Sequence, residues 1–209
     1  MSSRWGEIFT ATLQTAAFVL IAVGVGLTIC LAVGVFSHRY TAFKAPSLAI
    51  ASVLLTVPSL ALFALFIPIF GIGNPPVVVA LILYTLLPIL RNTVTGLDEV
   101  DPSIVEASRG VGLSNRQRLT RVEMPLAWPV ILTGIRVAVL LNCGVAAIAP
   151  LVGGDGLGVF VQDGLTRYPL PTSVERTWTG VVFTVLLALA LDLALGGIGR
   201  ATTAKGIRT

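Results

Sequence analysis

The segment DPSIVEASRGVGLSNRQRLTRVEMP, residues 101–125, is the long polar stretch of a chain made mostly of apolar runs. Long uncharged runs on either side of it are typical of membrane-spanning helices. A segment of this polarity does not fit in hydrocarbon, so we expect it to lie outside the membrane as a loop between two spans.

Capping signals divide this loop, which we take as residues 98–125, into two short helices. The signals are Asp101 and Pro102 at the start of the first helix, Gly110 and Gly112 at its end, and Ser114 with Gln117 as a capping box for the second. Pro125 is expected to end the unit. Ile104, Val105, Ala107, Val111 and Leu113 give the loop an apolar side.

Composition excludes an ordinary soluble domain. The 209 residues are 55% hydrophobic and 11% charged, whereas soluble domains carry about 25% charged residues. The net charge is +4, but the cations lie between apolar runs rather than along one soluble face, so nucleic acid is not an expected partner. Cys30 and Cys143 both lie within apolar runs, and no spacing of cysteine and histidine predicts a metal site.

Charges and helix breakers predict five spans in one all-α membrane domain, residues 1–209. The spans are residues 13–36, 46–70, 77–95, 128–151 and 178–199. A Gly- and Pro-rich break at residues 71–76 separates the second span from the third. The third is expected to extend past Arg91, whose long side chain can snorkel. Residues 153–177 are expected to form a Gly-rich polar loop.

The distribution of cations predicts the orientation. One set of alternating loops and the C-terminal tail carry Arg39, Lys44, Arg91, Arg109, Arg116, Arg118, Arg121, Arg200, Lys205 and Arg208, and the other side carries Arg4, Arg167 and Arg176. The positive-inside rule therefore places the loop and the C-terminus in the cytoplasm and the N-terminus outside. Five is an odd number of spans, which also places the two termini on opposite sides of the membrane.

Two interpretations of the loop follow from its residues alone. A short rigid helix off the membrane can insert into a groove on a partner protein, and Ala107, Ser108 and Gly112 would allow close backbone approach. The alternative is an amphipathic loop that rests on anionic lipid headgroups. Spacing does not decide between them.

The loop resembles the EAA motif of ABC importer permeases, which reads Glu-Ala-Ala, three residues, Gly, nine residues, Ile, one residue and Leu-Pro. Matching positions are Glu106-Ala107-Ser108, Gly112, Val122 and Met124-Pro125. Ser, Val and Met replace the motif's Ala, Ile and Leu. The resemblance implies that the loop docks into a separate ATPase subunit. The implied contact comprises Glu106, Ala107, Ser108, Arg109, Gly110, Val111, Gly112 and Leu113.

Further stretches resemble the glycine betaine, carnitine and choline uptake permeases. They are residues 56–62, 71–73, 86–93, 100–102, 134–136 and 153–158, where Asp155 departs from the usual glycine-rich pattern. The resemblance implies a bacterial inner membrane protein with a type I ABC permease (MetI-like) fold. It also implies a second permease subunit, ATPase subunits that bind ATP and Mg²⁺, and an extracytoplasmic substrate-binding protein that delivers a quaternary ammonium osmoprotectant. No Walker A loop occurs in this chain, so no cofactor of its own is expected.

Two charges fall inside predicted spans. Arg136 and Asp192 each lie about eight residues from the cytoplasmic end of their span, so their depths match and we expect them to pair. The pair could be a gate element or a static structural contact. Pro58 and Pro88 remove backbone hydrogen bonds within spans. The candidate polar residues of the path are Ser59, Asn92, Thr133 and Asn142, each of which could equally make a helix–helix hydrogen bond.

Alternative functions are kept open. An amino acid or another small organic ion could replace the osmoprotectant as cargo. An intramembrane enzyme lacks support, because no His-Glu-x-x-His or Gly-x-Ser-x-Gly motif is present. A passive channel or scaffold would not need a rigid docking loop.

Overall fold

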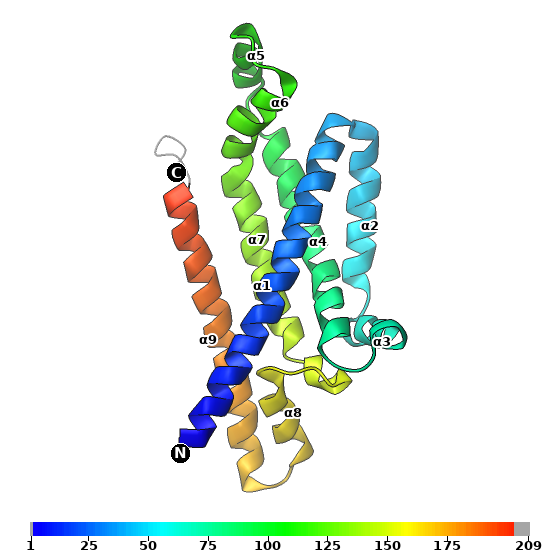
Figure 1. The fold of residues 1–209 in the computed structure, drawn as a ribbon, viewed down its shortest axis with the longest axis vertical. Helices are drawn as coiled ribbons and strands as arrows, with labels where there is room; N and C mark the ends of the chain where they lie inside the picture. Colours follow the sequence, from blue (N-terminus) through cyan, green and yellow to red (C-terminus); the bar gives the residue numbers. More distant parts are fainter. Residues whose placement is uncertain (1, 203–209) are drawn as a thin grey trace.

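The computed structural model describes residues 2–202, with side chains described for residues 5–202, and this part of the chain is helical and without strands (Figure 1). The order of elements is α1 (Ser2–Arg39), η1 (Thr41–Phe43), α2 (Lys44–Thr56), α3 (Ser59–Phe70), α4 (Asn74–Asp98), α5 (Pro102–Gly110), α6 (Asn115–Arg118), η2 (Leu119–Glu123), α7 (Met124–Ala146), η3 (Ala149–Val152), α8 (Gly158–Thr166) and α9 (Pro171–Thr202). Lys205 and Arg208, which contribute to the predicted orientation, lie outside the described residues, as does the side chain of Arg4.

Within the described part of the chain, four helices are long and apolar enough to cross a membrane. They are Trp5–Arg39, Asn74–Asp98, Asn115–Ala146 and Pro171–Thr202, and the bent pair of α2 and α3 raises the number to five if it counts as one span. The predicted first, third and fifth spans lie within α1, α4 and α9. The predicted fourth span, residues 128–151, is displaced toward the C-terminus relative to α7. This helix begins at Met124 and ends at Ala146, after which the chain enters the short 3-10 turn η3.

The second predicted span, residues 46–70, consists of two helices that meet at the proline within it, Pro58. α2 and α3 meet at 96°. Val57 and Pro58 between them are extended, with ψ of 129° and 133°, because proline has no N–H and disfavours helical backbone in the residue before it. α2 has 13 residues, about 20 Å at 1.5 Å per residue, which is shorter than the hydrocarbon core of about 30 Å.

Pro125 does not end the loop, contrary to the sequence prediction. α6, the π-helical turn η2 and α7 form one continuous helical stretch, Asn115–Ala146. A π turn widens the helix by one residue, and Pro125 follows this turn directly, so the wider turn accommodates a residue that has no N–H to donate within the helix. The second short helix of the loop is therefore the start of a transmembrane helix.

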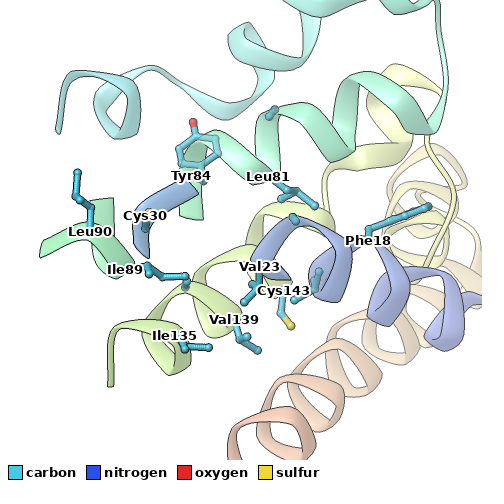
Figure 2. Close-up of a cluster of buried hydrophobic side chains, with 14 of the residues drawn as sticks. Phe18, Val23, Cys30, Leu81, Tyr84, Ile89, Leu90, Ile135, Val139 and Cys143 are labelled. Carbon is cyan, nitrogen blue, oxygen red and sulfur yellow. The ribbon is translucent and has the colours of Figure 1, made fainter. Parts of the chain in front are cut away.

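The core lies where α4 packs against α1 and α7 (Figure 2). Leu81, Ile89, Ile131 and Val139 are fully or almost fully buried there. At the crossing of α4 and α7, a Cβ added to Gly134 would lie 2.6 Å from the Pro88 carbonyl oxygen. Glycine thus allows the two backbones to touch, which is the usual device of membrane helix pairs.

The two ends of the molecule differ. At one end, here called the loop end, lie α5, α6, the junction of α1 with α2, and the C-terminal end of α9; the start of α1, α3 and α8 lie at the opposite end, here called the far end (Figure 1). The predicted Gly-rich polar loop, residues 153–177, is largely helical, because it contains α8 and the first turns of α9. Gly164 of α8 permits this hairpin, since a Cβ there would lie 2.0 Å from the Thr177 hydroxyl oxygen of α9.

Candidate functional site

The first helix of the loop, α5, is built as its capping residues predict. The Asp101 carboxylate accepts a hydrogen bond from the Ser103 N–H at 2.8 Å, and hydrogen bonds from the Ser103 backbone and side chain hold the pKa of this carboxyl below its usual value. At the other end, Gly112 adopts a left-handed φ of +80°, and the Leu113 N–H donates to the Ser108 carbonyl at 3.2 Å. Ser114 and Gln117 complete the capping box.

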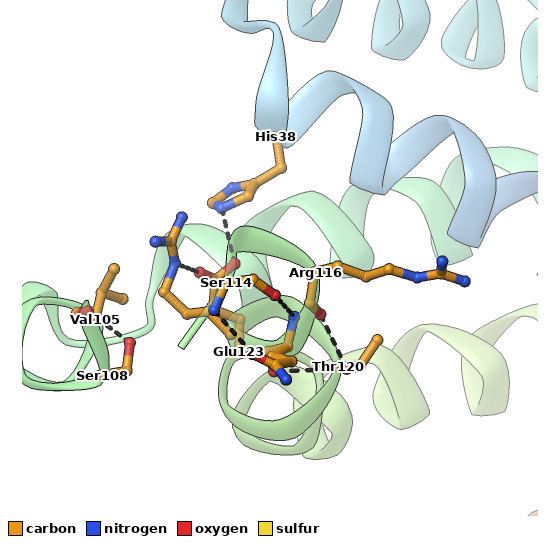
Figure 3. Close-up of polar contacts among 9 residues, drawn as sticks. His38, Val105, Ser108, Ser114, Arg116, Thr120 and Glu123 are labelled. Carbon is orange, nitrogen blue, oxygen red and sulfur yellow. Dashed lines mark hydrogen bonds and ion pairs between the residues drawn. The ribbon is translucent and has the colours of Figure 1, made fainter. Parts of the chain in front are cut away.

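The residues of the predicted ATPase contact lie on different faces of α5. Glu106 and Arg109 line a cavity of about 680 Å³ beneath the loop, together with His38 of α1 and Arg116 and Arg118 of α6. Ser108 is buried, and its hydroxyl donates to the Val105 carbonyl at 2.6 Å (Figure 3). Leu113 is half-buried.

The outward surface of α5 is formed by small and apolar residues. Ala107, Gly110 and Gly112 are exposed, and Val111 is 78% exposed. A Cβ at Gly110 or Gly112 would meet no atom within 4 Å. These four residues form a compact protrusion that a groove on another protein can enclose, whereas the charged residues of the segment are directed toward the cavity.

Glu123 anchors the loop to the bundle, a role that sequence reasoning missed. Its side chain is 7% exposed and accepts a hydrogen bond from Arg118 Nε at 2.8 Å. Nε2 of His38 lies 3.5 Å from the other Glu123 oxygen (Figure 3), and Nδ1 of the same ring lies 3.4 Å from Asp98. Lys44 of α2 also pairs with Asp98. One charge network thus joins the ends of α1, α2 and α4 to the loop. In the sequence, the feature that could have indicated this role is a single acidic residue, Glu123, at the end of an arginine-rich segment.

The predicted pairing of Arg136 with Asp192 is confirmed. Arg136 Nε and Nη2 each donate to one Asp192 oxygen at 2.7 Å, which is a bidentate ion pair between α7 and α9. The Arg136 side chain remains 43% exposed, and that of Asp192 is 18% exposed.

The polar candidates on α4 and α7 lie at the interface between these helices. The Asn92 amide donates to the Pro88 carbonyl at 2.8 Å, and Asn142 donates to Thr85 Oγ1 at 2.8 Å. Asn142 is fully buried, and its Oδ1 has no hydrogen-bond partner among the residues that the structure describes.

Pro58 and Ser59 lie apart from these residues, at the bend between α2 and α3. There the Tyr84 hydroxyl donates to the Val57 carbonyl, an acceptor that the bend has removed from the helix. Pro58 itself is exposed.

Asp155, which departs from the usual glycine-rich pattern, makes two hydrogen bonds with Asn74. Asn74 Nδ2 donates to the Asp155 carboxylate at 2.9 Å, and the Asp155 N–H donates to Asn74 Oδ1 at 2.8 Å. The Gly73 N–H also donates to the Val152 carbonyl at 3.1 Å. These bonds fasten the start of α4 to the segment after η3 at the far end.

Residues 24–203 match the family described as binding-protein-dependent transport system inner membrane component. The chain belongs to this family. It is 42% identical over its whole length to the osmoprotectant import permease protein OsmW of Salmonella typhimurium strain LT2, covering 97% of that protein. It is 35% identical to the choline transport system permease protein OpuBB and to the glycine betaine/carnitine/choline transport system permease protein OpuCB of Bacillus subtilis strain 168, covering 94% of each.

Solved structures confirm the fold of this ABC permease. A chain of the inward-facing MetNI methionine ABC transporter superposes with a TM-score of 0.83 at 24% identity, covering 98% of this chain and all of that one. A chain of an amino acid ABC transporter superposes with a TM-score of 0.70 at 17% identity, covering 96% of this chain and 94% of that one. The protein is therefore a multi-pass inner membrane permease subunit with the MetI-like fold.

Proposed function

We propose that this permease forms the translocation path for a quaternary ammonium osmoprotectant and couples it to ATP hydrolysis by a separate subunit. The observation that carries the cargo class is the whole-length identity of 35–42% to permeases named for osmoprotectant, choline, glycine betaine and carnitine transport. The methionine and amino acid transporters share the fold at 24% identity or less, so the amino acid alternative has weaker support.

The protrusion of Ala107, Gly110, Val111 and Gly112 is the proposed docking surface for the ATPase. Exposed small residues allow close approach of a partner groove. The loop end then faces the cytoplasm, as the arginine distribution requires, and the far end faces the extracytoplasmic substrate-binding protein. A second permease subunit, of the same or a related sequence, completes the path between the two copies. The permease itself holds no ATP and performs no chemistry.

The route from the docking surface to the path follows from two connections. α6 continues through the π turn into α7 without a break, so a displacement of the loop moves α7 as a rigid lever. Glu123 ties the same segment to α1 through His38. Motion of the ATPase would therefore reach Arg136 on α7, and Pro58, Ser59, Pro88, Asn92 and Asn142 remain candidate residues of the path or gate.

The test is uptake by cells that lack their own osmoprotectant importers and that express this permease with its ATPase and binding protein. Radiolabelled glycine betaine, carnitine or choline should accumulate, and methionine should not. Gly112→Asp should abolish uptake and co-purification of the ATPase while membrane insertion is unchanged, because it places a charged side chain on the docking surface and strains the left-handed backbone at this position. Thr120→Asp adds the same charge at an exposed site beyond this surface and should retain both. Normal ATPase association in Gly112→Asp would refute docking.

A further inference from the structure

The ion pair of Arg136 and Asp192 lies near the middle of the membrane. The loop end of the same two helices is marked by the hydrogen bond from Trp128 Nε1 to Thr202 Oγ1, 2.9 Å. Arg136 follows Trp128 by eight residues and Asp192 precedes Thr202 by ten, which correspond to about 12 and 15 Å along a helix. Half of the hydrocarbon core is about 15 Å, so both charges lie far from either headgroup layer.

The exposed edge of Arg136 is unsuited to lipid. A charged group facing hydrocarbon at this depth costs several kcal/mol, and such groups face a bundle interior or a water-filled cavity. The exposed residues of α7 around Arg136 are Thr133, Val137, Leu140 and Gly144, so this stripe mixes two apolar side chains with a hydroxyl and a glycine. By contrast α9 presents Val181, Val185 and Leu189 outward. The exposed edge of Arg136 thus marks this side of α7 as the one that faces the path.

From this geometry we infer that Arg136 and Asp192 form a transit site for a zwitterion that carries a carboxylate and a quaternary ammonium. This inference rests on the proposed function and adds to it a cargo selectivity within the permease, at the step where the cargo passes Arg136 and Asp192. The guanidinium, now bidentate on Asp192, can hold a cargo carboxylate with the same two donors. The released Asp192 then faces the cargo ammonium, which has no N–H and is attracted by charge alone.

Such an exchange leaves no charge unpaired in the membrane. The resident ion pair opens, the two poles of the cargo replace the missing partners, and the pair closes again behind the cargo. A cation without a carboxylate, such as choline, can occupy only the Asp192 side and leaves Arg136 without a partner. The pair should therefore favour betaines and carnitine over choline at this step, independently of the selectivity of the binding protein.

The experiment measures import of radiolabelled glycine betaine, carnitine and choline by the assembled transporter in proteoliposomes. In Arg136→Gln/Asp192→Asn, a near-isosteric neutral pair, import of both zwitterions should fall about tenfold relative to wild type, the effect of losing one charged hydrogen bond. Choline import should change less than about twofold, because choline loses the attraction of Asp192 together with the repulsion of an unpaired Arg136. Arg176→Gln/Asp163→Asn removes another ion pair, 2.5 Å, between α8 and α9, and should leave the cargo ratio unchanged.

Equal loss of all three cargoes with an intact complex would show a general gate and overturn the inference, as would unchanged import of all three. If the neutral pair fails to assemble, Arg136→Asp/Asp192→Arg restores an ion pair with reversed polarity. This variant should retain the preference for zwitterions, and a preference for choline would contradict the inference. A wild-type complex that imports none of the three compounds refutes the proposed function before any variant is compared.

Discussion

Gly134→Ala should separate the two central helices of the bundle. The added methyl would lie 2.6 Å from the Pro88 carbonyl oxygen and 2.7 Å from Asn92 Cβ, and carbon atoms normally stop at about 3.5 Å. One obstacle is backbone and the other is the first atom of a side chain, so neither can rotate away. Overpacking of this kind costs about 1–3 kcal/mol, which corresponds to a drop in Tm of about 2–12 °C for a chain of this size.

Gly144→Ala is the matched control on the same helix, because a Cβ there meets no atom within 4 Å. Both substitutions replace glycine within α7 and gain the same helix propensity, about 1 kcal/mol. Thermal unfolding of the purified permease in detergent, followed by tryptophan fluorescence, should show Gly134→Ala melting below wild type and Gly144→Ala at or above it. Equal melting temperatures for the two variants would refute the close crossing of α4 and α7.

Three further outcomes are expected. Glu123→Ala should destabilise the permease by about 3 kcal/mol, because it leaves Arg118 without a partner in a largely buried ion pair; an unchanged Tm would contradict this. Tyr84→Phe should lower stability by about 1 kcal/mol through loss of its bond to Val57, measured in the same assay. The lowered pKa of Asp101 means that its cap stabilises α5 above about pH 4 and is lost as pH falls further. Protection of the α5 amides from hydrogen exchange should therefore decrease only in strong acid. In Asp101→Asn, which does not titrate, this decrease should be absent.

Local rules predicted the loop well because its structure depends on neighbours in sequence. Asp101, Ser114 and Gln117 satisfy amides two or three residues away, and Gly112 supplies a backbone conformation that needs no partner. The pairing of Arg136 with Asp192 was also predictable, although they are far apart in sequence, since two charges at one membrane depth have few alternatives to each other.

Other features depend on contacts that sequence periodicity does not encode. The 96° bend could be anticipated as a kink at Pro58, but its angle depends on how α3 packs against α4. Hydrophobicity does not distinguish α8 from a loop, because its position is determined by the close approach of Gly164 to α9. Glu123 and the Asn74–Asp155 contact bring together residues from separate segments, so each half alone looked like an ordinary surface residue.

The most direct test of the central claim, that the α5 protrusion docks the ATPase, is site-specific photocrosslinking in cells. A photoreactive amino acid at Val111, which is 78% exposed at the loop end, should crosslink to the ATPase subunit. The same probe at Leu170, which is 54% exposed and lies in the turn between α8 and α9 at the far end, should not. Capture of the ATPase from position 170, or none from position 111 in a transporter that is active, would contradict both the docking surface and the orientation of the permease.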